Sequence, residues 1–269
     1  MISQTTSGEV VLLDRPAPHV ARLRINRPDK RNAIDHAVRQ ALIDALGALR
    51  GQPDVRALVF GGVAGVFSAG GDLPTMVGLS EDGARERLQH IHGLCRLVAD
   101  LGIPVVSAIE GIGAGAAVGL ALLGDQIVVG EGTKILFPFL QLGLAPDWGQ
   151  LLTLPRRVGL PAARRILTAG TAVTGPEALR IGLADALVND DQVMDEALRR
   201  AAEGARMPTG AFARMKNRLN EVSASLDAEL AREEADQVVC LLGDEFKEGF
   251  AAFRDKREAD FVGLPGARA

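Results

Sequence analysis

The sequence predicts an α/β fold in which helices cover a parallel or mixed sheet. Three observations lead to this fold class. Short strand patterns alternate with helical patterns over the first two thirds of the chain, Gly/Ala-rich segments interrupt that alternation, and the last part of the chain carries helical patterns alone. An alternation of strand and helix periodicities is typical of a sheet covered by helices.

Three segments have strand patterns. Residues 20–25 alternate between apolar and polar side chains and predict a half-buried strand. Residues 57–60 and 104–109 are short apolar runs, which predict strands buried on both faces.

Two helices are predicted between these strands, at residues 35–49 and 83–101, where apolar residues recur at helical spacing. Asp35 and Ser80 are the expected N-cap residues. Asp82 adds negative charge where the helix dipole favours it.

After about Asp185 the pattern becomes helical, and no strand signal follows. We therefore divide the chain into a β/α core at residues 1–195 and a C-terminal helical region at 196–269, which packs against the core or against another subunit. The Gly/Ala/Pro-rich end is expected to be frayed. The predicted C-terminal helices cover residues 193–205, 210–223, 226–241 and 245–253.

Composition excludes several classes of protein. The net charge is only -4 and 47% of the residues are hydrophobic, so there is no basic field for nucleic acid or anionic lipid. Residues 1–13 lack the features of a signal peptide, and every long apolar run is interrupted, so we expect a cytoplasmic protein without membrane insertion. Cys95 and Cys240 have no disulfide or metal-type spacing and are interpreted as two buried thiols.

Two Gly/Ala-rich segments, residues 66–73 and 110–119, are candidates for ligand contact. Small residues let a ligand approach the backbone, and the free N–H groups at a helix start favour an oxyanion or a phosphate. Close packing between a helix and a strand is the alternative use of such segments. A dinucleotide-binding fingerprint is not present, because the final glycine of G-x-G-x-x-G and the later acidic residue are absent.

Five segments, in this order along the chain, resemble the motifs of the crotonase (enoyl-CoA hydratase/isomerase) superfamily. The resemblance covers about residues 10 to 262 and implies the crotonase fold, a spiral of β-β-α units followed by a helical region that forms trimers or paired trimers. The five segments are residues 26–34, 67–73, 110–116, 143–149 and 248–257.

The resemblance also implies an acyl-CoA substrate and no separate cofactor, since coenzyme A enters as the thioester. By position, the backbone N–H groups of Gly71 and Ala116 correspond to the family's oxyanion hole, although position 116 is usually Gly. Lys30 and Arg31 could equally be a solvated charge pair. The residues that the resemblance places along coenzyme A are Asp29, Lys30, Arg31, Ala33, Ala69, Asp72 and Leu73.

The chain departs from the family at its catalytic positions. Hydratases of the family carry two glutamates, and the corresponding positions here are Gly119 and Phe139, which cannot transfer a proton. Asp147 lies where some subgroups keep a catalytic acid, and apolar neighbours would raise its pKa by desolvation. The alternative is that Asp147 lies in a turn after Pro146 or caps a helix at 148–154.

The other candidate residues are given structural roles. The carboxylates of Asp72 and Asp125 are interpreted as structural, and His90 and His92 face different sides of a helix, so that no metal pair is implied. Four phenylalanines near the C-terminus predict core packing or a subunit interface. The resemblance adds that this helix closes over a neighbouring site, with Lys256 or Arg257 near the nucleotide phosphates. The four are Phe246, Phe250, Phe253 and Phe261.

From these observations we expect an acyl-CoA isomerase activity in which Gly71 and Ala116 hold the thioester oxygen and Asp147 transfers the proton. The alternatives are hydration or carbon–carbon cleavage with other groups, and a non-catalytic acyl-CoA carrier. Asp147 favours the enzyme over the carrier, whereas Gly119 and Phe139 favour the carrier.

Overall fold

The computed structural model describes residues 9–264. Its main sheet has six strands in the order β1-β2-β3-β4-β6-β9, in which β1 pairs antiparallel to β2 and all later neighbours are parallel. The predicted parallel or mixed sheet is therefore confirmed. Its strands are β1 (Val11–Ala17), β2 (Val20–Ile25), β3 (Ala57–Gly62), β4 (Val105–Ile109), β6 (Gln126–Gly130) and β9 (Ala186–Val188).

A second, smaller sheet has the order β5-β7-β8. The chain moves from a strand of the large sheet to a strand of the small sheet and then to a helix, once in β4-β5-α3 and again in β6-β7-α4. This repetition is the spiral of β-β-α units that the fold prediction requires. The strands of the small sheet are β5 (Ile112–Ala114), β7 (Lys134–Leu136) and β8 (Val173–Thr174).

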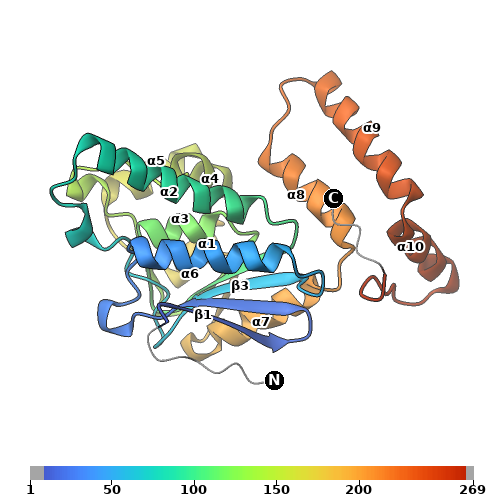
Figure 1. The fold of residues 1–269 in the computed structure, drawn as a ribbon, viewed down its shortest axis with the longest axis horizontal. Coiled ribbons are helices and arrows are strands. Elements are labelled where there is room, and N and C mark those ends of the chain that lie inside the picture. The colour runs from blue at the N-terminus through green and yellow to red at the C-terminus, as the bar shows by residue number, and fades with distance from the viewer. Residues whose placement is uncertain (1–8, 265–269) are drawn as a thin grey trace.

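Helices cover both faces of the large sheet (Figure 1). Every residue of β3 and β4 is buried, because α7 packs on one face and the core beneath α1, α2 and α3 lies on the other. This explains why these strands are apolar throughout instead of alternating. The helices are α1 (His36–Arg50), α2 (Glu81–Ala99), α3 (Ala116–Leu122), α4 (Gln150–Val158), α5 (Leu160–Ala169), α6 (Gly175–Arg180), α7 (Val193–Gly204), α8 (Thr209–Asn220), α9 (Leu226–Leu242) and α10 (Asp244–Asp255).

Both predicted N-caps are confirmed. The Asp35 carboxylate accepts a hydrogen bond from the Val38 N–H at 2.9 Å, and the Ser80 hydroxyl accepts one from Gly83 at 3.1 Å. Each side chain satisfies one of the N–H groups that the first turn of a helix leaves without a partner. The predicted beginnings of α1 and α2 are therefore correct to within two residues.

The prediction that no strand follows Asp185 is wrong. Residues 186–188 form β9, which pairs in parallel with β6 at the edge of the sheet. Three residues are too few to show the alternation of a strand, so β9 is recognised only by its pairing with β6. The next helix, α7, crosses the predicted division at residue 195 and packs on β3 and β4.

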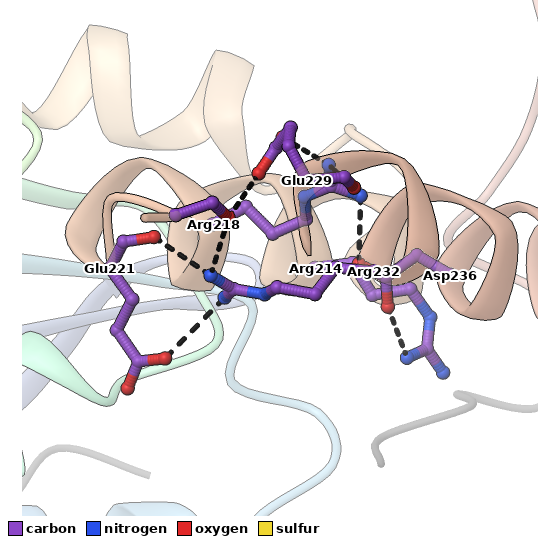
Figure 2. A network of polar contacts seen from close by, with 7 residues as sticks. Arg214, Arg218, Glu221, Glu229, Arg232 and Asp236 are labelled. Atoms are coloured by element: carbon purple, nitrogen blue, oxygen red, sulfur yellow. Dashed lines mark hydrogen bonds and ion pairs between the residues drawn. The ribbon is translucent and has the colours of Figure 1, made fainter. Parts of the chain in front are cut away.

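The last helices extend away from the sheet (Figure 1). Helix α8 is anchored to the core by Lys216, which is 4% exposed and donates to Asp125 Oδ2 at 2.8 Å and to the Ile103 carbonyl at 3.2 Å. Arginine–carboxylate pairs then join α8, α9 and the turn between them, including Arg218 with Glu229 and Arg214 with Asp236 (Figure 2). Charged contacts thus join α8 to α9.

The aromatic residues of α10 are exposed in the single chain. The exposed fractions of Phe246, Phe250 and Phe253 are 48%, 57% and 83%. Packing in the chain's own core is therefore wrong for these three residues, and the subunit interface stays a prediction. Helix α9 likewise has no buried residue.

Other predictions can be compared with the fold. Cys95 and Cys240 are free, but both are only half-buried, so the expectation of two buried thiols is wrong. No helix within residues 9–264 is both long and apolar enough to span a membrane. The expected fraying of residues 263–269 falls mostly outside the described residues.

Candidate active site

The two Gly/Ala-rich segments lie side by side. The Ser68 N–H donates to the Ile112 carbonyl, and the Ala114 N–H donates back to the Ser68 carbonyl, both at 3.1 Å. Gly70 has a φ of +91°, and a Cβ there would lie 2.5 Å from the Ala114 carbonyl oxygen. Only glycine fits this conformation and this contact, so the two segments can approach each other this closely only because residue 70 is glycine.

Two backbone N–H groups at this junction have no hydrogen-bond acceptor among the described residues. Ile34 donates to the Gly70 carbonyl and accepts from the Asp72 N–H, so the N–H of Gly71 between them takes no part in that bridge. Ala116 is the first residue of α3, where an N–H has no acceptor within the helix. Within residues 9–264, neither the Gly71 nor the Ala116 amide has a hydrogen-bond acceptor.

Both residues line a cavity of about 370 Å³. Asp72 and Asp147 are the carboxylates of its lining. The greater part of the lining is apolar, as expected of a small-molecule site with a few polar groups. The apolar side chains are Ala33, Ala69, Leu73, Pro74, Met76, Ala116, Pro138, Phe139, Leu142, Leu144 and Trp148.

Asp147 enters the cavity from the loop before α4. Burial raises the pKa of its carboxyl above the ordinary value, while the charges of Arg87 and His92 oppose the shift. Its Oδ1 is buried and has no hydrogen-bond partner in the part of the chain that the structure describes. A partly buried carboxylate with one unpartnered oxygen beside a cavity is a candidate general base, because desolvation makes it a stronger proton acceptor.

The capping alternative for Asp147 is not supported. Helix α4 begins at Gln150 with Gly149 as its N-cap, and no side chain caps it. Asp147 contributes only its backbone carbonyl, which accepts from the N–H and from Nε2 of Gln150. The carboxylate is therefore left available to the cavity.

Comparison with known proteins identifies the family. The model of the enoyl-CoA hydratase/isomerase family matches residues 17–264. The chain belongs to the enoyl-CoA hydratase/isomerase family. It is 30% identical to the 1,2-epoxyphenylacetyl-CoA isomerase of Escherichia coli over 91% of this chain and 95% of that protein.

Hydratases are equally similar. The crotonyl-CoA hydratase of Syntrophomonas wolfei is 30% identical over 90% of this chain and 94% of its own. The crystal structure of an enoyl-CoA hydratase from Polaromonas superposes with a TM-score of 0.88 at 28% identity, covering 93% of this chain and 98% of that one. The crotonase fold is therefore confirmed, and the relatives include both an isomerase and hydratases.

Gly119, the residue that we expected at the position of the first hydratase glutamate, lies against Trp148. A Cβ on Gly119 would overlap the Cβ of Trp148 and lie 3.0 Å from Nε2 of Gln150. Trp148 is 2% exposed and is carried there by a left-handed backbone, with φ of 54° at Trp148 and 74° at Gly149. The indole thus takes the space that a side chain at position 119 would need.

Phe139, the residue that we expected at the position of the second glutamate, is also apolar. Phe139 is 6% exposed and lines the cavity, and a Cβ on Gly115 would lie 3.8 Å from its Cζ. Neither Gly119 nor Phe139 has a side chain that transfers a proton. Of the two carboxylates that line the cavity, Asp72 is paired with Arg27, whereas Asp147 has no cationic partner at salt-bridge distance within residues 9–264.

The carboxylates given structural roles have structural partners. Asp72 forms an ion pair with Arg27 at 3.2 Å, and Arg27 also reaches Asp35 at 3.0 Å. Asp125 accepts from the Val105 N–H and from Lys216, both at 2.8 Å.

The first motif lies at the mouth of the same site. Lys30 and Ala33 line the cavity, whereas Asp29 and Arg31 are exposed and do not. The Arg31 carbonyl accepts from the Ala69 N–H at 2.9 Å, which joins this motif to the second one. Contact of this motif with coenzyme A stays a prediction.

Arg87 is a site residue that the sequence analysis missed. Its Nη2 lies 3.7 Å from the position of a Cβ on Gly71, and burial lowers its pKa while Asp147 and Asp72 oppose the shift. One sequence signal could have revealed it: Arg87 precedes Ile91 and Leu94 on the buried stripe of α2, where a charge is unusual.

The same helix brings Cys95 near Asp147, but burial and that carboxylate raise the pKa of the thiol to about 12, so it stays protonated.

Proposed function

We propose that the protein is an enoyl-CoA isomerase, in which the N–H groups of Gly71 and Ala116 bind the thioester oxygen and Asp147 moves the proton. The position of Asp147 carries the proposal: it is a partly buried carboxylate in the cavity lined by those two residues, and its Oδ1 has no hydrogen-bond partner within residues 9–264.

The reaction needs one base and one oxyanion site. Asp147 takes a proton from the carbon next to the thioester carbonyl of a 3-enoyl-CoA, and the electron pair moves onto the carbonyl oxygen. The enolate oxygen accepts hydrogen bonds from the two backbone amides, each typically worth about 3 to 4 kcal/mol in other enzymes. The carboxyl exchanges its proton with solvent during the lifetime of the dienolate and then protonates the far end of the dienolate. The double bond thus moves by one carbon, with no net gain or loss of atoms.

The apolar cavity supports the same reaction. It excludes water from the enolate, and it raises the pKa of Asp147 so that this residue can accept and release a proton more readily. Coenzyme A enters as part of the substrate, with Lys30 at the mouth of the cavity.

Proton exchange in deuterated water tests the proposal. The wild type should incorporate deuterium into a 3-enoyl- or 2-enoyl-CoA, and Asp147→Asn should lose this exchange by about 10² to 10⁴ in rate, the usual contribution of a general base. Equal exchange by wild type and Asp147→Asn would exclude Asp147 as the base.

A non-catalytic acyl-CoA carrier is the second candidate, and the apolar Gly119 and Phe139 favour it. A carrier would bind acyl-CoA tightly and exchange no deuterium with any substrate of the panel. Hydration or carbon–carbon cleavage would instead give a product whose mass differs from that of the substrate.

We also propose that the exposed aromatic face of α10 joins subunits into a trimer or a dimer of trimers in the cytoplasm. The residues proposed to meet a neighbour's coenzyme A are Lys256 and Arg257. Arg257 already pairs with Glu248 at 2.6 Å, so it would have to exchange this partner for a phosphate.

A further inference from the structure

A second cavity lies between α1 and α2, beside the acyl site. It measures about 890 Å³, and its lining includes Arg39 from α1 and Arg87 from α2. The pKa of Arg39 is lowered to about 10, mainly by burial and in part by the positive charge of Arg87. The two arginines are therefore close to each other. Two cations thus face one cavity.

Neither arginine has a carboxylate at salt-bridge distance within residues 9–264. Arg39 is 2% exposed, and its Nε donates to His90 Nδ1 at 3.3 Å. Its Nη1 has no hydrogen-bond partner among the described residues. Buried cations in proteins are normally paired, because leaving one unpaired is costly. Carboxylates therefore act on the two arginines from a distance, but none within residues 9–264 is in direct contact with either guanidinium.

The other groups of the cavity do not supply an anion in direct contact with the arginines. Asp35 is already bonded to Arg27 and to the first turn of α1, and Glu86 is an exposed residue. His90 accepts from Arg39 and its Nε2 lies 3.1 Å from Gln40 Oε1, and burial lowers its pKa, so it is neutral at pH 7. His36 stacks on His90, with ring centroids 4.5 Å apart.

Arg87 connects this cavity to the acyl site. A Cβ on Gly71 would overlap Cε of Met76 and lie 3.7 Å from Nη2 of Arg87. Met76 lies at the end of the short 3-10 helix η2 (Leu73–Met76), whose residues line both cavities. A methionine side chain is unbranched and changes its conformation easily, so Met76 can move aside for an acyl chain that runs from one cavity to the other.

We propose that the cavity between α1 and α2 binds a carboxylate at the far end of the acyl group, so that the substrate is the coenzyme A thioester of a dicarboxylic acid. The apolar middle of the acyl chain lies against Met76, and the carboxylate accepts hydrogen bonds from Arg87 and Arg39. The proposal rests on the proposed function, since the thioester is taken to lie at Gly71 and Ala116.

Paired substrates test the proposal. Enoyl-CoA thioesters that end in a methyl group or in a carboxylate are compared over a series of chain lengths, by deuterium exchange and by calorimetric binding. For one chain length, the wild type should prefer the carboxylate by about 10- to 100-fold, the range expected for charged hydrogen bonds. Arg87→Gln should lose this preference, whereas Arg85→Gln, on the exposed face of the same helix, should keep it.

The outcomes separate this proposal from the proposed function. Tight, Arg87-dependent binding of the carboxylate series without deuterium exchange would support the cavity and overturn the isomerase. Exchange with no preference between the two series in the wild type would overturn the cavity and leave the isomerase. Arg39→Met gives a second measurement of the preference for the carboxylate. Arg87→Gln is the decisive variant, because Arg87 is only half-buried and its substitution disturbs the fold less.

A free anion is the other source of the same chemistry. Inorganic phosphate alone is added in a thermal unfolding experiment with wild type and Arg87→Gln. Stabilisation by phosphate that needs Arg87, together with equal use of methyl and carboxylate substrates, would assign the cavity to a free anion and overturn the acyl-carboxylate proposal.

Discussion

Trp148 lies directly over Gly119, so closely that a Cβ on Gly119 would overlap the Cβ of Trp148. The glycine and the tryptophan are therefore one packing unit, built from α3 and from the loop that carries Asp147. Because Trp148 and Asp147 are adjacent in the chain, the packing of the indole also fixes where the loop presents the carboxylate.

Gly119→Ala should destabilise the fold. The added methyl group has no room and must displace Trp148, and such overpacking typically costs about 1 to 3 kcal/mol. Gly93→Ala is the matched control: Gly93 is also helical, and a Cβ there meets nothing within 4 Å. This control should stabilise by up to about 1 kcal/mol, because alanine is the better helix former. Urea denaturation of both variants measures the difference, and equal stability would show that Trp148 can move freely.

The charge of Arg87 should set the pH at which Asp147 works. The pKa of Asp147 is raised by burial and is lowered in part by Arg87. The proposed base is active when ionised, so kcat/KM should fall as the pH drops through a pKa that lies above 3.8. Arg87→Gln removes the opposing cation, and the acid limb should then move to higher pH. A pH profile of deuterium exchange on a methyl-terminated substrate measures this, and an unmoved limb would mean that Arg87 does not act on the base.

Local patterns predicted the helix starts at Asp35 and Ser80, since a cap is decided by residues within one turn. They did not predict β9 or the role of Arg87. Strand β9 is only three residues long and forms by backbone pairing with β6. Arg87 and Asp147 lie 60 positions apart by residue number, and only the folding of α2 across the site brings their charges together. Long-range contacts of this kind leave no trace in sequence spacing.

Lys216 should be the most important charged residue of the C-terminal helices for stability. It is 4% exposed and donates to Asp125 and to the Ile103 carbonyl, and burial lowers its pKa. Lys216→Met removes the buried partner of a pair whose carboxylate is 26% exposed, and the loss of such a charged hydrogen bond typically costs about 1.5 to 3 kcal/mol.

Lys247→Met is the control for Lys216→Met, since Lys247 pairs with Asp244 at the same 2.8 Å but both side chains are more than half exposed. That change should cost no more than about 1 kcal/mol. Denaturation midpoints of the two variants give the comparison. A similar loss in both would show that α8 does not depend on its buried lysine.

The exposed aromatic face of α10 should be an association surface. Phe253 is 83% exposed and Phe250 is 57% exposed, and the rings of Phe246 and Phe250 on the same helix are tilted by 33° with centroids 6.2 Å apart. Large apolar side chains gathered on one surface favour contact with another chain. Phe253→Asp would place a charge in that contact and should shift the sedimenting species to a lower mass without a change in the helix content measured by circular dichroism.

Val222→Asp provides the matched control for Phe253→Asp, because Val222 is 78% exposed but lies in the turn between α8 and α9. It should leave the mass unchanged at the same protein concentration. If Phe253→Asp sediments like the wild type, α10 is not the contact. Deuterium exchange by the dissociated variant then tells whether the proposed neighbouring Lys256 and Arg257 are needed: a raised KM with unchanged kcat would fit residues that only hold the nucleotide end of the substrate.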